Sequence, residues 1–271
     1  MSARRISRQS SRGRWILWAL LMAVGYAGFL GARAPASVGA WLVAKASGGR
    51  LRLGGTEGSL WDGSAQEVVL RLGPGAEYAL GRVRWQVRWG GLWKGHLAIP
   101  IWVAGTDDDA HAVMAWAFGM VRITHLAAAF DGSPLMRQLP LLTPAGLRAR
   151  VRMHSDALSF SRSGGLKGHA EMTLSDVATS LGPVSTLGTY AVRIVFAGAG
   201  ARFRIATVRG PLALSGTGAW SKALGVRFEG VALPEGPRAG ALDFFASRMG
   251  RRQPNGSYQV LWPQGLVAAL P

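Results

Sequence analysis

The chain has 271 residues, of which 49% are hydrophobic, so it can bury a sizeable core and is too apolar to be disordered. Its formal net charge is +17, but the arginines are scattered along the chain rather than clustered on one element, which argues against a nucleic-acid partner. The chain contains no cysteine, and this excludes disulfides, thiolate nucleophiles and cysteine-based metal sites. Acidic protein surfaces and anionic lipid headgroups remain compatible partners.

The N-terminus predicts a membrane anchor. Residues 1–14 form a basic tail, and residues 15–32 form an uncharged apolar run long enough for one transmembrane helix. The arginines before the run favour a cytoplasmic amino side. Amphipathic rings expected in the headgroup layers lie toward the two ends of the run, at Trp15, Trp18, Tyr26 and Phe29. A cleaved signal peptide is the alternative, but the length of the run and its bulky aromatics favour an uncleaved anchor.

Residues 33–48 are predicted to be a juxtamembrane linker that contains a short helix, since Val38, Trp41, Leu42 and Lys45 have helical spacing. From residue 49 the apolar period changes from that of a helix to two. Residues 49–271 are therefore predicted to form one all-β domain in the periplasm. The scarcity of aromatics in the second half suggests two lobes, with a seam near residues 131–146.

Two arginine-rich strands define the pattern. In the first, Val83, Trp85, Val87 and Trp89 alternate with cationic side chains, which are Arg82, Arg84 and Arg88. In the second, apolar residues between 147 and 153 alternate with Arg148, Arg150 and Arg152. Similar alternation occurs at 97–103, 166–174, 190–196, 202–205, 212–215, 226–228 and 258–262. Short strands with turns between them predict an antiparallel sheet with one buried face, interrupted by helices near 134–142 and 239–249.

The search for catalytic chemistry finds no motif. The sequence contains no HExxH, GxSxG, Walker-type or GxGxxG pattern, and its histidines are dispersed. His154 and Asp156 share a face of a predicted strand, but a solvated pair explains them better than an acid–base dyad. No catalytic, metal-binding or cofactor-binding site is predicted, and binding or assembly is favoured over catalysis.

One segment carries a family resemblance. It predicts a strand, a tight turn and a returning strand, and its distinctive residues are Gly55, Thr56, Gly58, Leu60, Trp61, Gly63 and Ala65. The strand with Trp85 and Trp89 and a Leu-Trp-Lys-Gly turn follow it, and further matching segments occur in order as far as residue 258. Together they resemble the type II secretion system protein N family over nearly the whole chain. These residues are expected to be structural, with the glycines permitting tight turns and Trp61 filling core volume.

The resemblance implies a non-enzymatic accessory component of type II secretion in the Gram-negative inner membrane. Its partners would be inner-membrane platform proteins, with the outer-membrane secretin as a further candidate. The family is also similar to periplasmic proteins whose long curved sheet forms a groove for lipids, so a lipid-binding or lipid-transfer function is the alternative. The arginine faces could meet an acidic partner or could simply be solvated.

Overall fold

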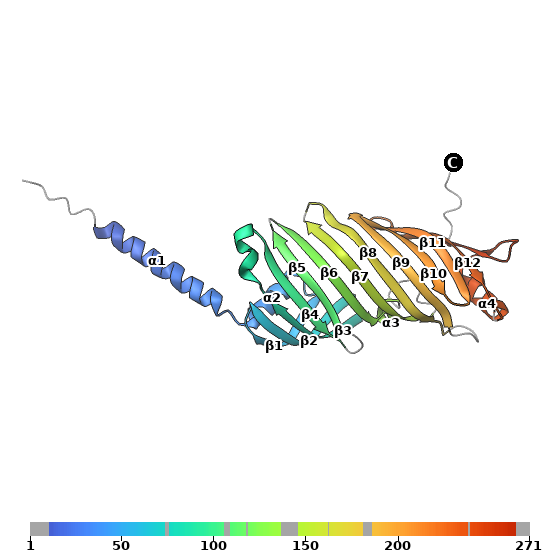
Figure 1. Ribbon diagram of the computed structural model, residues 1–271, viewed down its shortest axis with the longest axis horizontal. Helices are drawn as coiled ribbons and strands as arrows, with labels where there is room; N and C mark the ends of the chain where they lie inside the picture. The colour runs from blue at the N-terminus through green and yellow to red at the C-terminus, as the bar shows by residue number, and fades with distance from the viewer. Residues whose placement is uncertain are drawn as a thin grey trace, which may run out of the picture.

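The computed structural model describes residues 11–73, 76–105, 109–117, 119–136, 146–161, 163–180, 186–237 and 239–263. Most of the predicted basic tail therefore lies outside the described residues. The chain begins with the long helix α1 (Ser11–Ala32) and the shorter helix α2 (Ala36–Ala46). In Figure 1, α1 extends away from the rest of the molecule, which is an elongated, curved sheet. This arrangement confirms the predicted fold class: an apolar helix followed by a large antiparallel sheet with few helices.

The sheet has 14 strands, which are paired in the order β1 to β12, then β14, then β13. The first seven strands are β1 (Leu51–Gly58), β2 (Asp62–Gly73), β3 (Ala76–Gln86), β4 (Leu97–Ala104), β5 (Asp109–Ala117), β6 (Met120–Asp131) and β7 (Arg148–Ser161). The others are β8 (Gly165–Ala178), β9 (Thr186–Gly198), β10 (Gly200–Arg209), β11 (Leu212–Ser221), β12 (Gly225–Pro234), β13 (Arg251–Arg252) and β14 (Tyr258–Trp262). Three short helices join strands: η1 (Trp89–Lys94), α3 (Ser133–Met136) and α4 (Ala239–Met249).

The sheet curls strongly at its N-terminal end. Tyr78 on β3 and Phe130 on β6 lie three strands apart, yet their ring centroids are only 6.2 Å apart. Neighbouring strands are spaced by about 4.8 Å, so a flat sheet would hold strands three places apart at roughly three times that distance. The face that carries both rings is therefore concave. Shifts of register accompany the curl, and one lies beside His125, whose φ of 53° marks an irregular point in β6.

Strand register places apolar side chains on the concave face and cations on the other. Val83 is opposite Val103, and Trp85 is opposite Ile101 on the same face. The intervening Arg84 is opposite Trp102 on the convex face. Alternation recurs in later strands such as β7, where Arg148, Arg150 and Arg152 are exposed and Ala149 and Val151 are buried. We refer to the two sides as the concave apolar face and the convex cationic face.

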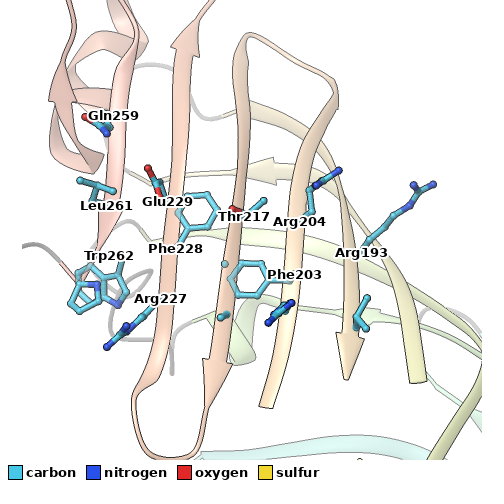
Figure 2. A pocket seen from close by; sticks show the side chains of 15 residues that line it. Arg193, Phe203, Arg204, Thr217, Arg227, Phe228, Glu229, Gln259, Leu261 and Trp262 are labelled. Carbon is cyan, nitrogen blue, oxygen red and sulfur yellow. The ribbon is translucent and has the colours of Figure 1, made fainter. Parts of the chain in front are cut away.

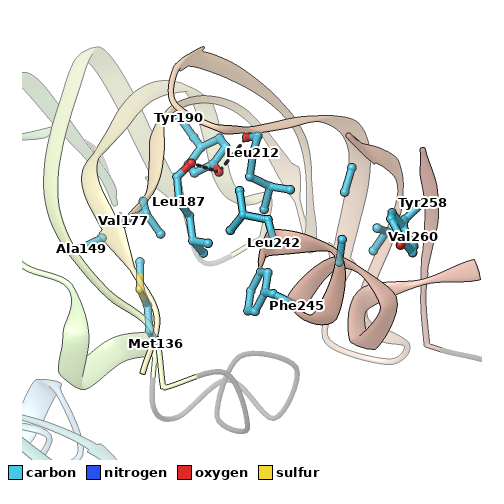
Figure 3. Close-up of a cluster of buried hydrophobic side chains, with 12 residues drawn as sticks. Met136, Ala149, Val177, Leu187, Tyr190, Leu212, Leu242, Phe245, Tyr258 and Val260 are labelled. Carbon is cyan, nitrogen blue, oxygen red and sulfur yellow. Dashed lines mark hydrogen bonds between the residues drawn. The ribbon is translucent and has the colours of Figure 1, made fainter. Parts of the chain in front are cut away.

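Helix α4 closes the concave apolar face at the C-terminal end of the sheet. Leu242 points from the helix toward Leu212, and Phe245 and the strand residues Tyr258 and Val260 belong to the same buried cluster (Figure 3). These side chains are nearly fully buried, with Leu242 only 1% exposed. The stripe of apolar residues predicted for 239–249 is therefore the core-facing side of a real helix.

Three expectations about the strands need comment. Trp89 was predicted on the strand of Trp85, which is wrong: β3 ends at Gln86, and Trp89 begins the 3₁₀ helix η1. The helix near 134–142 is found only as α3, and residues 137–142 lie outside the described part of the chain. The sheet also continues past residues 131–146, since β6 and β7 on either side are paired. If the domain has two lobes that meet near residues 131–146, the strands on either side of that seam are still paired in one sheet.

Candidate functional site: the membrane-proximal junction and the concave face

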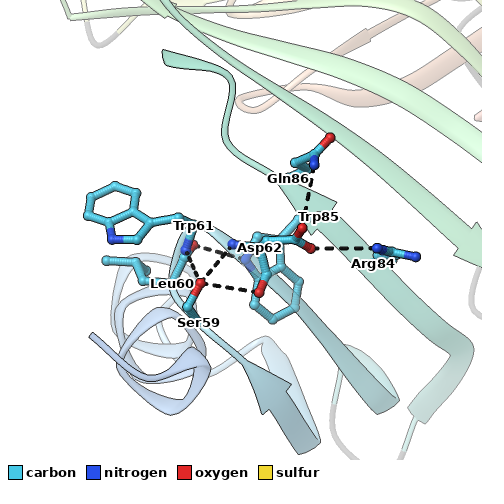
Figure 4. Close-up of polar contacts among 7 residues, drawn as sticks. All are labelled: Ser59, Leu60, Trp61, Asp62, Arg84, Trp85 and Gln86. Atoms are coloured by element: carbon cyan, nitrogen blue, oxygen red, sulfur yellow. Dashed lines mark hydrogen bonds and ion pairs between the residues drawn. The ribbon is translucent and has the colours of Figure 1, made fainter. Parts of the chain in front are cut away.

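The segment with the family resemblance forms the turn between β1 and β2. The Ser59 hydroxyl oxygen accepts hydrogen bonds from the Trp61 and Asp62 amides at 3.3 and 3.0 Å, and the Ser59 amide donates to the Asp62 carbonyl at 2.8 Å (Figure 4). A serine side chain that bonds backbone amides two and three residues later stabilises such a turn. The predicted strand, turn and returning strand are therefore confirmed.

Trp61 joins this turn to the end of α1. Its indole Nε1–H donates to the carbonyl of Gly31 in the last turn of α1 at 2.8 Å. The Leu60 amide donates to the Ala34 carbonyl, also at 2.8 Å, and Pro35 forms a bridge with Ser59. The Gly31 carbonyl also accepts from the Ala34 amide at 3.2 Å, so the indole adds a second donor at the C-terminus of α1, where carbonyls lack partners further along the helix. We call this set of contacts the membrane-proximal junction.

Two more tryptophans complete the junction. Trp89 packs against Trp61 with ring centroids 4.4 Å apart, and Trp85 donates its indole Nε1–H to the Leu60 carbonyl at 3.0 Å. Trp89 reaches Trp61 because β3 ends early and the chain turns into η1. Three tryptophans from separate segments thus surround one turn. Nothing in the sequence indicated that they would meet.

The small residues of the segment permit this packing. Ala65 is fully buried, and Thr56 is opposite it in the β1–β2 ladder. Gly55 and Gly58 have φ angles of 58° and 83°, which side-chain-bearing residues adopt only with strain. Gly63 lies so close to Trp85 that a Cβ would stand 2.6 Å from the indole ring and 2.6 Å from the Ser59 carbonyl oxygen.

Gly63→Ala is accordingly expected to lower the free energy of unfolding by about 1–3 kcal/mol, the usual effect of overpacking a filled site. The matched control is Gly90→Ala, because a Cβ there would meet nothing within 4 Å. Urea unfolding of the full chain in detergent, followed by circular dichroism, measures both variants. Equal stability of the two would show that Gly63 is not packed as the structure describes.

The concave apolar face is one surface that could take a ligand. Val83, Trp85, Ile99 and Ile101 lie on it, and all four are half-buried rather than sealed. In the described part of the chain no second sheet covers them, and the helices that pack on the sheet lie near its two ends, apart from the short α3 beside β7. A curved apolar wall of this kind can bind acyl chains or other extended apolar groups.

The predicted arginines lie on the opposite side. All six are exposed: Arg82, Arg84, Arg88, Arg148, Arg150 and Arg152. Arg84 is also part of the junction, since its guanidinium is 3.8 Å from the Asp62 carboxylate. At such exposure this ion pair contributes little to stability. No contact indicates whether the arginines meet a partner, so a partner-facing role for them stays a prediction.

A shallow hollow of about 910 Å³ lies near the C-terminal end of the sheet (Figure 2). Cationic side chains lie around it, with aromatic residues of the neighbouring strands, and its lining includes Arg193, Arg204, Arg227, Phe228 and Trp262. Sequence reasoning missed this hollow because its arginines are spread over three strands and come together only when the strands pair.

His154 and Asp156 are the pair that the sequence raised as an alternative acid–base dyad. His154 and Asp156 lie 3.1 Å apart, but both side chains are largely exposed, which confirms a solvated pair. Burial raises the pKa of Tyr190, whose hydroxyl lies within hydrogen-bond distance of the carbonyls of Leu187 on β9 and Leu212 on β11 and thereby links the starts of these two strands. Among the described residues, no group of three or more His, Cys, Asp or Glu side chains could hold a metal ion.

Comparison with known proteins identifies a family for this chain. The family model described as type II secretion system (T2SS), protein N, matches residues 49–261, which include every strand of the sheet. No curated protein and no solved structure matches the chain. Since the matched residues cover well over half of the sequence, the chain belongs to the type II secretion system protein N family.

Proposed function

We propose that this protein is a single-pass component of the inner membrane whose N-terminus is cytoplasmic and whose sheet lies in the periplasm, where it contacts other type II secretion subunits. Family membership makes it an accessory component of type II secretion. The segment Trp15–Ala32 is long and apolar enough to span a membrane, and none of it is buried against the rest of the protein. Its partners would include the inner-membrane platform proteins, with the outer-membrane secretin as a further candidate.

The observation that carries this proposal is the membrane-proximal junction. Hydrogen bonds from Trp61 and Leu60 reach the last residues of α1 and the linker that follows. A sheet attached in this way has a defined direction relative to the anchor, unlike a domain on a free tether. A defined direction suits a part that must meet membrane-embedded subunits on one side and periplasmic ones on the other.

Crosslinking in native membranes tests the proposal. The tagged full chain is crosslinked in the cells that produce it, purified under denaturing conditions and analysed by mass spectrometry for attached proteins. Type II secretion subunits are expected, and they should be lost when α1 is replaced by an unrelated transmembrane helix of equal length. Recovery of no secretion subunit would contradict the proposal.

Lipid carriage is the second candidate, and the concave apolar face favours it. Ile101 and Trp102 are neighbours on β4, but Ile101 lies on the concave face and Trp102 on the convex one. Ile101→Asp places a charge on the apolar wall, whereas Trp102→Asp, at a side chain that is 41% exposed, leaves the wall unchanged.

The test is to extract the full chain with an amphipathic polymer instead of detergent and to measure co-purified lipid by mass spectrometry. Lipid carriage predicts that Ile101→Asp loses most of the lipid that the wild type retains and that Trp102→Asp retains it. Circular dichroism confirms that both variants are folded. Equal lipid in the two variants would contradict binding at the concave face.

A further inference from the structure

Two elements near the end of α1 expose apolar side chains that the fold does not use. On helix α2, Val38, Trp41 and Leu42 are exposed, with Trp41 at 58%. On η1, Trp93 is 98% exposed, and Trp89 is 47% exposed on the side away from Trp61. Large apolar side chains are seldom left so exposed without a binding role when several of them gather.

These two elements lie beside the point where the chain would leave the membrane. Helix α2 begins four residues after α1 ends, at Ala36. Helix η1 is held there through tryptophan contacts, since Gly31 of α1 accepts from Trp61 and Trp61 packs on Trp89. In Figure 1, α2 and the helix between β3 and β4 lie at the end of the sheet that α1 approaches, and α4 lies at the far end.

Cations accompany the exposed rings. The Lys45 ammonium lies 4.8 Å from the ring centroid of Trp41, and the Arg33 guanidinium lies 5.2 Å from that of Phe29, which is in the last turns of α1. Arg88, next to Trp89, is exposed as well. Asp62, at the start of β2, is already paired with Arg84. Tryptophan with arginine or lysine is the combination that favours the headgroup layer, where the ring meets the acyl boundary and the cation meets phosphate.

We propose that Val38, Trp41 and Leu42 of α2 together with Trp93 of η1 form an interfacial surface that rests in the headgroup layer of the bilayer spanned by α1, with Lys45, Arg33 and Arg88 meeting anionic phospholipid. This proposal rests on the proposed transmembrane anchor. Continuity with the anchor favours lipid over a protein partner, because a surface only four residues from the end of the span cannot move far from the bilayer. The N-terminal end of the sheet is then held at the membrane, and the end that carries α4 extends into the periplasm.

The absence of cysteine from the wild-type chain makes a direct test simple. Single-cysteine variants of the full chain, each labelled with one fluorophore, are placed in nanodiscs of phosphatidylethanolamine and phosphatidylglycerol, with or without lipid that carries a quencher at a shallow acyl position. Trp41→Cys and Trp93→Cys report on the interfacial surface. Leu20→Cys reports on α1 itself, and Leu224→Cys, a 63% exposed position in the β11–β12 turn, is the control at the far end of the sheet.

The labels at positions 41 and 93 are expected to lose about half of their fluorescence or more to the lipid quencher, as interfacial side chains should, while the label at 224 is unaffected. Omission of phosphatidylglycerol should weaken the effect if the cations contribute as proposed. Quenching at position 20 but not at 41 and 93 would overturn this inference and leave the anchor intact. Absence of quenching at position 20 would overturn the anchor itself. Labels at 41 and 93 that are shielded from both lipid and aqueous quenchers would indicate a second copy of the chain on this surface, and this outcome also overturns the proposal.

Discussion

Replacement of Phe245 by alanine is expected to lower the free energy of unfolding by about 3–5 kcal/mol, the range for removing a buried aromatic side chain. Phe245 is 5% exposed and packs among Leu242, Leu212 and Tyr258, where α4 meets the sheet (Figure 3). The same buried cluster includes Met136 of α3 as well as side chains of the sheet, and loss of the ring removes contacts with this cluster.

Phe244 supplies the matched control, because it is the adjacent residue of the same helix and is 51% exposed. Its ring faces the Arg248 guanidinium at 5.1 Å, an exposed cation–π contact worth about 0.5–1 kcal/mol, so Phe244→Ala should stay near that value. Urea titration of the full chain in detergent, monitored by circular dichroism, gives both numbers. A loss for Phe245→Ala no larger than that for Phe244→Ala would contradict the position of α4.

Trp61→Ala is expected to have the next largest effect. It should weaken the attachment of the sheet to α1 by about 3 kcal/mol, at the lower end of the range for large aromatics because Trp61 is only half-buried. The substitution removes the hydrogen bond to Gly31 and the packing on Trp89. The strands of the sheet do not depend on either contact, so the loss should appear as freedom of the sheet relative to α1 rather than as loss of β structure.

Spin labels on introduced cysteines, one at Leu20 in α1 and one at Val195 on β9, measure that freedom in nanodiscs. Both positions are more than half exposed. The wild-type background should give one narrow distance distribution and Trp61→Ala a broad one. Trp61→Phe keeps a ring against Trp89 but removes the N–H donor, so its distribution should be intermediate. A narrow distribution in Trp61→Ala would mean that the membrane-proximal junction does not orient the sheet.

Strict alternation explains which strands could be predicted from the sequence. In β7, Arg148, Arg150 and Arg152 face solvent while Ala149 and Val151 are buried, so charged and apolar residues alternate along the strand. In β5, by contrast, Ala112, Val113, Met114 and Ala115 are all half-buried, and the apolar run carries no period. Strands β5 and β6 fell within the stretch that no prediction covered, because a strand whose two faces are both apolar cannot be distinguished from a buried helix by periodicity.

The junction was only half predictable for a different reason. The turn itself depends on neighbours in sequence, such as Ser59 and Asp62, and local turn chemistry indicated it. The contact of Trp61 with Gly31 spans 30 residues, and that of Trp61 with Trp89 depends on where β3 ends. In the sequence, apolar and cationic residues alternate as far as Trp89. In the structure, the pairing of β3 with β4 ends near Trp85, and the chain then turns into η1, where Trp89 packs against Trp61. Tertiary packing here outweighs local strand preference.

The family assignment bears on the contacts between the sheet and α1. Residues 49–261 match as one unit, and Trp61, Gly63 and Ala65 lie where that unit meets the anchor. Their structural role is thus compatible with the proposed function, which requires that they orient the sheet. The concave apolar face and the interfacial surface of α2 and η1 remain the two surfaces through which lipid could act.

Secretion by a deletion strain tests most directly whether this chain acts in type II secretion. The gene is removed from the cell that carries it, and a folded exoprotein is quantified in the medium and in the periplasm. We predict less exoprotein in the medium and more in the periplasm, with both restored by the wild-type chain expressed in trans. Unchanged amounts in both compartments would contradict an accessory role in export.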